Sequence, residues 1–326
     1  MTGSSTSAPE GATPPSPLGR VPRVAVYGGA NADIQGFCYR PYKPGDSNPG
    51  RSTLAAGGVG RNIAENLARL GARTELVTVF GDDSLAGFIR ASCDAVGLRY
   101  ERSVFLSDEP SPRYLCILDA DGGLVGAVAA MDALERFSPE ALAERYAPGD
   151  EADAVVLDAN LPAATLLAAA ERWRDKPLLL DTVSEAKAGK ALGLLPYLAA
   201  IKPNRAEASL ITGLTEPTAA AAALLAAGVR EAFVSLGAGG LLWLGPEGGG
   251  IVRPPSLPVV NVSGAGDALS AALAWGAALG LHSERKARLA EAAAGLCASS
   301  AEAVNPGMDA RALYELAQGV RLEPLS

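Results

Sequence analysis

Near the carboxyl-terminal end of the chain stands the stretch Val259-Val260-Asn261-Val262-Ser263-Gly264-Ala265-Gly266-Asp267-Ala268-Leu269. A β-branched run leads into a glycine-rich turn, and the turn opens an apolar helical pattern that continues to about Leu279. The backbone N–H groups of Gly264 to Asp267 are therefore expected to point outward from the start of a helix. Such groups, together with the helix dipole, bind anions, and the glycines allow a phosphate to come close.

Asp267 is an unexpected residue in a phosphate-binding turn, because its negative charge opposes that of the ligand. Its presence is explained if the carboxylate acts as a base on a hydroxyl group that attacks phosphorus. The alternative is a helix cap beside a turn. The turn is neither a Walker A loop, which needs Lys-Ser or Lys-Thr after the glycines, nor a dinucleotide fingerprint, which has a third glycine.

Upstream of this turn, short apolar runs alternate with longer helical patterns. The helix predicted over 59–70 places Val59, Ile63, Leu67 and Leu70 on one face and ends at Gly71. Strands are predicted at 24–28, 76–80, 154–157, 178–180, 198–201 and 232–236. This alternation indicates an α/β fold in which helices cover both faces of a parallel sheet.

Two segments interrupt the alternation, at about 36–56 and 111–131. The first contains three prolines between residues 37 and 56 and has no helical pattern, and the second is typical of a hairpin with a turn at 119–123. Together they predict a small β-rich lid over the carboxyl edge of the sheet. We therefore expect one domain over 21–326 with two inserted lid segments, preceded by a disordered tail over 1–20.

Composition and charge narrow the classes of function. The 326 residues are 48% hydrophobic and 20% charged, which excludes a wholly disordered chain and allows a large core. The net charge of −8 repels phosphate backbones, so no nucleic-acid partner is expected. No apolar run is long enough to cross a bilayer and the first residues lack a secretory pattern, so no membrane association is expected.

Histidine and cysteine usage is equally restrictive. The single histidine, His282, lies in a polar stretch, which excludes most catalytic triads and histidine-based zinc sites. Four scattered cysteines, Cys38, Cys93, Cys116 and Cys297, form no CxxC pair. They are typical of small buried residues in a reducing, cytoplasmic compartment.

Polar residues and glycines also follow the first predicted strand and open the first predicted helix. Asn31 and Asp33 lie just past the strand, where a carboxylate can accept hydrogen bonds from neighbouring sugar hydroxyls; the alternative is turn chemistry. Gly57 and Gly58 allow a ligand to approach the start of the helix, and Asn62 offers it a donor and an acceptor. The alternative for these three residues is a tight strand-to-helix turn.

Two further patterns follow later strands. Asn204 and Glu207 are three residues apart and could hold a water-coordinated Mg²⁺ near phosphates, although the same spacing is that of a helix capping box. The glycine turn that begins at Ser235 and includes Gly237 and Gly240 could form the floor of an adenine slot.

Taken together, these residues resemble the ribokinase-like (PfkB) family of carbohydrate and nucleoside kinases. The first family signature is matched from Gly57-Gly58-Val59-Gly60-Arg61-Asn62 to Gly81-Asp82-Asp83, and the second by Gly264-Ala265-Gly266-Asp267. The likeness extends from Val24 to about Val304. It implies a three-layer α/β/α sandwich with a mainly parallel central sheet and a small β-rich lid, with ATP and Mg²⁺ as cofactors.

The resemblance assigns a role to each matching residue. Asp267 matches the catalytic base, and Gly264, Ala265 and Gly266 match the anion hole. The positions that hold sugar hydroxyls are matched by Asn31, Asp33, Gly57, Gly58 and Asn62, with Asn160 as a further substrate contact. The nucleotide and its phosphates are assigned to Asn204, Glu207, Lys187, Ser235, Gly237 and Gly240, with Glu207 holding Mg²⁺ through water.

Within the family, the resemblance is closest to the members that phosphorylate the 5′-hydroxyl of pseudouridine, notably at Asp46-Ser47-Asn48-Pro49-Gly50. Candidate contacts to the nucleobase are Ser47, Asn48, Tyr114, Met131 and Asp132. Another ribosyl nucleoside or sugar (ribose, fructose or adenosine) is the alternative substrate, and a non-catalytic nucleoside-binding protein is the alternative function.

One departure and one surface remain open. Many family members have Asp-Thr where this chain has Asn261 and Ser263, which puts dependence on a monovalent cation in doubt. Relatives often pair through the lid, and Tyr39, Tyr42 and Leu115 could form such a homodimer surface or pack inward.

Overall fold

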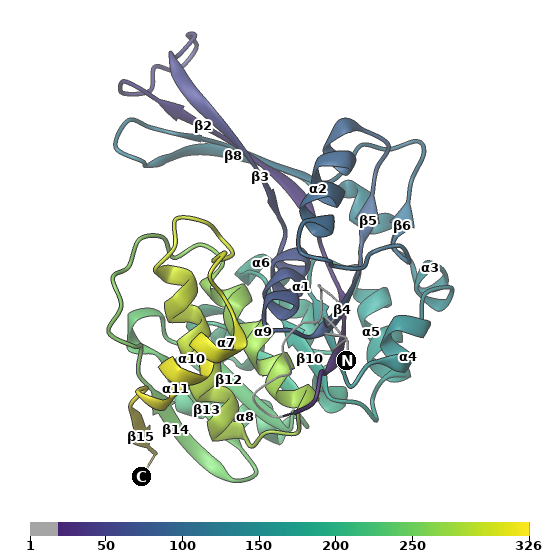
Figure 1. Cartoon of the computed structure of the whole chain (residues 1–326), viewed down its shortest axis with the longest axis vertical. Coiled ribbons are helices and arrows are strands. Elements are labelled where there is room, and N and C mark those ends of the chain that lie inside the picture. The colour runs from purple at the N-terminus through teal and green to yellow at the C-terminus, as the bar shows by residue number, and fades with distance from the viewer. Residues whose placement is uncertain (1–18, 326) are drawn as a thin grey trace, which may run out of the picture.

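The central sheet of the computed structural model, which describes residues 19–325, has nine strands in the order β15-β14-β13-β12-β11-β10-β9-β1-β4 (Figure 1). Neighbours from β12 to β4 run parallel, and β13, β14 and β15 continue the sheet antiparallel. The parallel strands are β1 (Arg23–Tyr27), β4 (Arg73–Val77), β9 (Ala154–Asp158), β10 (Leu178–Asp181), β11 (Ala200–Lys202) and β12 (Glu231–Ser235). The antiparallel strands are β13 (Leu241–Gly245), β14 (Gly248–Val252) and β15 (Leu322–Pro324). The predicted, mainly parallel sheet is confirmed.

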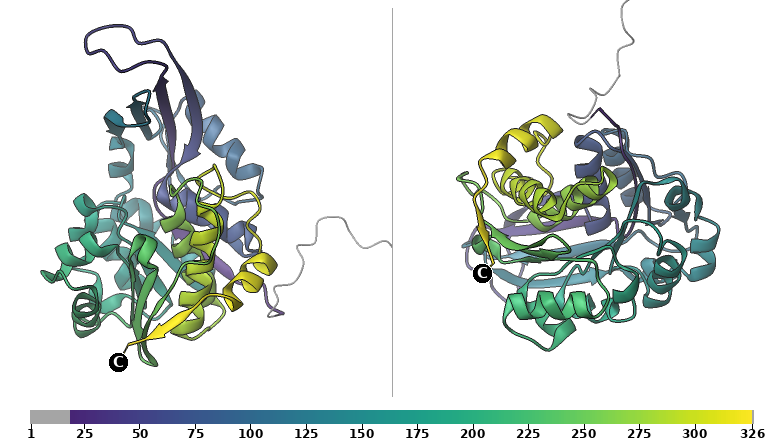
Figure 2. Two further views of the ribbon diagram at one scale, coloured as in Figure 1. Left: turned by 90° about the vertical axis from the view of Figure 1, so that its left-hand side faces the viewer. Right: turned by 90° about the horizontal axis from the view of Figure 1, so that it is seen from below.

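Helices cover both faces of this sheet, as the two views of Figure 2 show. One core cluster is formed with α1 (Val59–Arg69), α2 (Ser84–Asp94), α9 (Ala265–Ala278), α10 (Ser283–Ala298) and α11 (Ala310–Gln318). The other lies with α3 (Pro139–Ala143), α4 (Ala147–Glu151), α5 (Ala163–Arg172), α6 (Glu185–Ala188), α7 (Arg205–Thr212) and α8 (Pro217–Ala226). Successive residues of β1 alternate between them: Val24 and Val26 face the first, Ala25 and Tyr27 the second. A strand buried on both sides must be apolar throughout, which explains the continuous run in the sequence.

Helix α1 forms as its pattern predicts. Ile63 and Leu67 are fully buried in the core, and Gly71 follows the helix with a φ of 79°. Gly58 precedes the helix with a φ of 97°, and a Cβ there would lie 2.5 Å from the carbonyl oxygen of Gly29. The glycine is therefore required where the chain turns from the lid into the helix.

Two predicted strands differ from the structure. The strand predicted at 76–80 is two strands, because after Val77 the chain leaves the central sheet and β5 (Val79–Phe80) pairs with β6 (Val104–Phe105). The strand predicted at 198–201 begins only at Ala200, since Leu195–Tyr197 form a 3₁₀ turn. The β-branched run before the glycine turn is not a strand; Val259 and Val262 are about 70% exposed beside a cavity.

The lid is a separate four-stranded sheet in the order β3-β2-β7-β8. Its strands are β2 (Asn31–Cys38), β3 (Gly50–Gly57), β7 (Arg113–Leu118) and β8 (Leu124–Ala130). The two interrupting segments supply them, although β2 begins at Asn31, before the predicted boundary. Figure 1 shows this sheet projecting away from the body beyond α1.

Residues 1–18 of the predicted tail lie outside the described part of the chain, and Arg20 forms an ion pair with Asp153. No single helix within residues 19–325 is long and apolar enough to cross a membrane; α7 and α8 reach that length only jointly, across a bend of 49°. His282 is exposed, and the four cysteines are free.

Candidate active site

The glycine turn at the start of α9 carries Asp267 in the first turn of the helix. Gly264 adopts a φ of 78°, and a Cβ on it would collide with the carbonyl oxygen of Ala303. No side chain in the described structure caps this helix; the N–H of Ala265 donates to the carbonyl oxygen of Val262 at 3.3 Å, and those of Gly266 and Asp267 remain available to an anion. The glycine turn thus lies at the start of a helix, as its pattern predicts.

Asp267 lies beside a residue 205 positions earlier in the chain. The Nδ2 of Asn62, in the first turn of α1, donates to Oδ2 of Asp267 at 2.8 Å. Burial, assisted by the negative charge of Asp181, raises the pKa of Asp267 to about 7, while the bond from Asn62 opposes the rise. The starts of α1 and α9, which two separate sequence patterns indicated, therefore meet at the Asp267 carboxylate.

The residues past β1 gather at the root of the lid. Asn31 donates from Nδ2 to Oδ1 of Asp33 at 2.6 Å. Gly57 lies opposite Asn31 across the β2–β3 ladder, and a Cβ on Gly57 would collide with the Asp33 carboxylate. Tyr114 faces Asp33 from β7. Burial raises the pKa of Asp33, against the hydrogen bond from Asn31, which lowers it.

Three charged residues to which the sequence analysis assigned no role end neighbouring strands at this edge: Asp158 on β9, Asp181 on β10 and Lys202 on β11. Burial raises the pKa of Asp158 to about 6, although its carboxylate accepts the N–H groups of Gly29 and Asn160, each at 2.8 Å. The signal that could have identified them is position, since each is the last residue of a strand whose neighbours carry the site.

Lys202 and Asp181 are a buried ion pair, with 3.0 Å between Nζ and Oδ2. The same oxygen accepts the hydroxyl of Ser270 at 2.6 Å. Lys202 Nζ also lies 3.3 Å from the position that a Cβ on Gly266 would occupy. The only ammonium among these three strand ends therefore faces the glycine turn.

Asn204 and Glu207 form the capping box that was the alternative interpretation of their spacing. Asn204 Oδ1 accepts the N–H of Glu207, and Glu207 Oε2 accepts the N–H of Asn204, both at 2.9 Å. Glu207 is buried and also accepts from the hydroxyl of Thr182 at 2.6 Å. Lys187 donates to the side chain of Asn160. Asn160 and Asn204 follow β9 and β11 directly, and Lys187 and Glu207 lie on α6 and α7, the helices that come after β10 and β11.

A cavity of about 390 Å³ lies beside the glycine turn of α9. It is lined by both predicted glycine turns and by α10, including Ser235, Gly237, Gly240, Gly266 and Glu291. The sequence analysis missed Glu291, which is 5% exposed and whose pKa burial raises to about 7. The only sequence feature that could have indicated Glu291 is a carboxylate on the buried face of an alanine-rich helix.

The candidate nucleobase contacts are not gathered with Asp267. The loop between β2 and β3, which carries Ser47 and Asn48, lies at the end of the lid far from α9 (Figure 1). Asn48 holds the turn there, with its amide bonded to backbone atoms of Lys43 and Asp46. Met131 is half-buried and Asp132 exposed at the start of a 3₁₀ turn.

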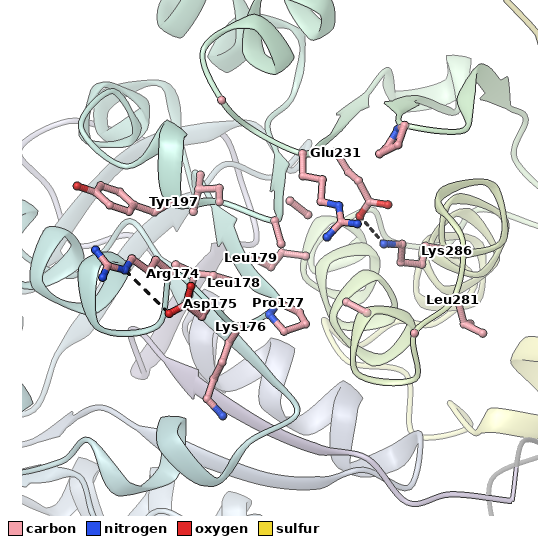
Figure 3. A pocket seen from close by; sticks show the side chains of 18 of the residues that line it. Arg174, Asp175, Lys176, Pro177, Leu178, Leu179, Tyr197, Glu231, Leu281 and Lys286 are labelled. Atoms are coloured by element: carbon pink, nitrogen blue, oxygen red, sulfur yellow. Dashed lines mark hydrogen bonds and ion pairs between the residues drawn. The ribbon is translucent and has the colours of Figure 1, made fainter.

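A larger cavity, of about 590 Å³, lies at the opposite, amino edge of the sheet (Figure 3). It is lined by the starts of β10, β11 and β12, and by Lys286 of α10, which pairs with Glu231. None of the predicted site residues lines it. Cavity size and the predicted site residues therefore point to opposite edges of the sheet.

Comparisons with known proteins identify the family of the chain. The model for the pfkB family carbohydrate kinase matches residues 21–311. A pseudouridine kinase of Escherichia coli (strain K12) is 29% identical over 291 residues, which cover 87% of this chain and 93% of that one. A carbohydrate kinase from Agrobacterium tumefaciens has a similar structure, with a TM-score of 0.84 and 31% identity over 94% of this chain and 100% of that one. Arabidopsis thaliana ribokinase complexed with ribose and ATP gives a TM-score of 0.77 and 25% identity, over 92% and 99% of the two chains.

Proposed function

Since the chain belongs to the pfkB family of carbohydrate kinases, we propose that it transfers the γ-phosphoryl group of ATP to the 5′-hydroxyl of pseudouridine, giving pseudouridine 5′-phosphate. The observation that carries the proposal is the placement of Asp267 in a free helix start, bonded to Asn62 of the other signature. The likeness to the Escherichia coli pseudouridine kinase supports the choice of substrate.

Asp267 is the general base of the proposed reaction. The 5′-oxygen of the nucleoside attacks the γ-phosphorus, the bond from that phosphorus to the bridging oxygen of ADP breaks, and the hydroxyl proton passes to the Asp267 carboxylate. A pKa of about 7 suits this task, because a base works best when its pKa is near the operating pH. Asp267 is half-buried in the first turn of α9, where its carboxylate would accept the proton of the 5′-hydroxyl.

The turn from Gly264 to Gly266 stabilises the transferring group. Its backbone N–H groups and the positive end of α9 face the charge that develops on the phosphoryl oxygens. Lys202, held by Asp181 next to Gly266, adds a positive charge on the same side. These dipoles are fixed before the reaction begins, so little reorganisation is needed at the transition state.

ATP places its base in the cavity beside Ser235, Gly237 and Gly240, and its phosphates extend toward the α9 turn. Asn204, at the start of α7, and Lys187, on α6, are the further phosphate contacts. No cluster of three or more metal-ligating side chains exists among residues 19–325, which fits an Mg²⁺ carried by phosphates and water. Glu207, whose oxygens are held by the capping box, would contact such an ion through water. When bound, Mg²⁺ neutralises charge on the phosphates.

The ribosyl group lies at the root of the lid, where Asp33 and Asn31 hold its hydroxyls and Gly57 and Gly58 allow close approach. Asn160 completes this side of the site. Closure of the lid would bring Tyr114 and the Ser47–Asn48 loop, with Met131 and Asp132, toward the nucleobase and exclude water from the transfer.

The lid also supplies the proposed homodimer surface. Leu115 and Val128 face each other across the β7–β8 ladder and are 39% and 63% exposed, and Tyr39 is 66% exposed. Burying such residues against a second copy would remove apolar surface from water. We further propose a cytoplasmic location, which the free cysteines support. The side chain of Asn261 bonds to the backbone of Ala301 and Ser263. We therefore assign it no role in holding a monovalent cation.

A substrate panel tests the proposed function. ATP turnover is measured with pseudouridine, uridine, ribose, fructose and adenosine under identical conditions. We expect kcat/KM for pseudouridine to exceed every other value by ~10-fold or more, since a site that pairs a ring N–H discriminates against bases that lack it. A higher kcat/KM for ribose, fructose or adenosine would show that the proposed substrate is wrong. Binding of a nucleoside without ATP turnover would show that the protein is not a kinase of that nucleoside.

A further inference from the structure

We infer that Arg61 is a positioning residue, which fixes the orientation of the Asn62 amide beside Asp267 and ties that amide to the root of the lid. The inference rests on the proposed function, because it concerns how the base of that reaction is held. Arg61 has no role in the phosphoryl transfer described above, so the inference adds a residue to the proposed site.

One nitrogen of the Arg61 guanidinium makes both contacts. Nη1 donates to Oδ1 of Asn62 at 2.9 Å and to the backbone oxygen of Ala56 at 2.9 Å. Ala56 belongs to β3, one residue before the strand ends at Gly57. The same group therefore contacts the amide that reaches Asp267 and the strand by which the lid joins α1.

An arginine at this position decides which end of the amide faces the base. A guanidinium only donates hydrogen bonds, so the neighbouring end of Asn62 must be its oxygen. The NH₂ end is then directed at Asp267, where it is found at 2.8 Å. With the amide reversed, its oxygen would face a carboxylate and its NH₂ group would face a cation, and both contacts would be repulsive.

The orientation also determines what Asn62 offers to a substrate. Because Oδ1 is turned toward Arg61, the side chain presents its NH₂ group to the site. One hydrogen is used on Asp267, and the second remains for a substrate oxygen. Asn62 can therefore bridge the base and the alcohol as a donor, while Asp33 serves as the acceptor. The sequence analysis expected both roles from Asn62 alone.

The guanidinium itself is held rigidly. Arg61 is 6% exposed and pairs with Glu65, which is also 6% exposed. Glu65 is fixed in turn by Arg69, which donates to Oε1 from Nε at 2.9 Å and from Nη2 at 2.7 Å. Nε of Arg61 donates to the hydroxyl of Ser92 at 3.3 Å. Arg69 contacts the same carboxylate from the outer side without reaching Asn62, which makes it the matched control.

Three single variants of the full-length protein test the inference: Arg61→Lys, Arg61→Gln and Arg69→Gln. Arg61→Lys retains the charge opposite Glu65 but lacks the planar fork that spans Asn62 and Ala56. For both Arg61 variants we expect kcat to fall ~10- to 100-fold, the scale of a hydrogen bond that involves a charged group. Arg69→Gln is expected to keep kcat within about two-fold while lowering Tm. Thermal melts identify any variant that fails to fold.

The pH profile separates orientation from general loss of stability. The bond from Asn62 lowers the pKa of Asp267, so its loss should move the acid limb of kcat/KM to higher pH in the Arg61 variants. The other groups that act on Asp267 are Asp181, Asp158 and Lys202, and the charge of Asp267 in turn raises the pKa of the Cys297 thiol on α10. All of these are retained in the variants. The inference would be contradicted if the acid limb of kcat/KM lay at the same pH in the Arg61 variants as in Arg69→Gln.

A double-mutant cycle with Asn62→Ala completes the test. If Arg61 acts through Asn62, Arg61→Gln/Asn62→Ala loses no more kcat than Asn62→Ala alone. Additive losses would overturn the inference and leave the proposed function intact. Asp267→Asn is measured in parallel, because normal turnover in that variant would overturn the proposed function itself.

Discussion

The two edges of the central sheet each contain a buried lysine–carboxylate pair, but they differ in charge balance. At the amino edge, Lys286 pairs with Glu231 and Ser283 donates to the same carboxylate. At the carboxyl edge, Lys202 pairs with Asp181 and also acts on Glu207 and Asp267, while Lys187 acts on Asp158, so four carboxylates face two ammonium groups. The amino edge has the larger cavity, about 590 Å³ against about 390 Å³. The edge proposed to be reactive thus differs from the other by a surplus of negative charge, which a catalytic base needs and a structural pair does not.

The largest expected effect concerns the base itself. Asp267→Asn removes the proton acceptor and retains the size of the side chain, so turnover should fall ~10²-fold or more, the scale of general-base loss. Steady-state kinetics with ATP and pseudouridine measure it. Glu231→Gln is the control at the other edge, where we expect lower Tm and kcat within about two-fold. Equal kinetic losses at the two edges would contradict the comparison.

The two buried lysines sharpen the comparison. Lys286→Met leaves Glu231 buried without its ammonium, which should cost ~3 kcal/mol or more of unfolding free energy while kcat stays within about two-fold. Lys202→Met should lower kcat by ~10-fold or more and raise the pKa of Asp267, because the positive charge of Lys202 lowers it.

Denaturant unfolding and the pH dependence of kcat/KM provide the two measurements. The comparison would be wrong if Lys286→Met moved the acid limb, or if Lys202→Met left both kcat and that limb unchanged.

The surplus charge also predicts how stability depends on pH. The pKa of Asp267 is raised from 3.8 in the unfolded chain to about 7, so the folded state binds the extra proton between these values. Its stabilising contribution is complete below pH 3.8 and is lost as the pH rises through about 7. Asp267→Asn, which cannot ionise, should therefore have a Tm ~2 °C or more above that of the parent protein at pH 8.

The difference in Tm should shrink at pH 5, where the parent carboxyl is protonated. Activity changes in the opposite direction, because kcat/KM of the parent protein falls as the pH drops through 7. A Tm difference that is the same at both pH values would show that the mutation stabilises through packing instead of charge.

Much of this arrangement could be predicted from local sequence. The apolar periodicity of α1, the alternation of strands and helices, and the two glycine turns are local signals, and each has its element in the structure. From the sequence, Asn62 and Asp267 could be assigned only to the same edge of the sheet. Their direct contact could not be predicted, because the two residues are 205 positions apart.

The buried charges were harder to predict. Asp158 and Asp181 end strands, but a carboxylate after a strand is usually turn chemistry. Glu291 lies on a helix whose neighbours are alanines, and its burial depends on the packing of α10 against α9. The prediction of one continuous strand over 76–80 was wrong, because periodicity does not indicate where a chain leaves one sheet for another. Long-range packing decides these points.

The smallest expected effect concerns Glu291, a buried carboxyl of α10 that has no ion pair among the described residues. Its pKa is raised to about 7 by burial alone, whereas Glu231 at the amino edge has its own lysine. Because Glu291 lines the cavity proposed for the base of ATP, its ionisation should change KM for ATP two- to five-fold between pH 6 and pH 8. Glu291→Gln, which keeps the shape but cannot ionise, should remove that dependence and leave kcat within about two-fold. Since Asp267 remains in this variant, the acid limb of kcat must persist. If the pH dependence of KM persists as well, Glu291 has no contact with the nucleotide, and the surplus charge that matters is confined to the three strand-end and helix-start aspartates.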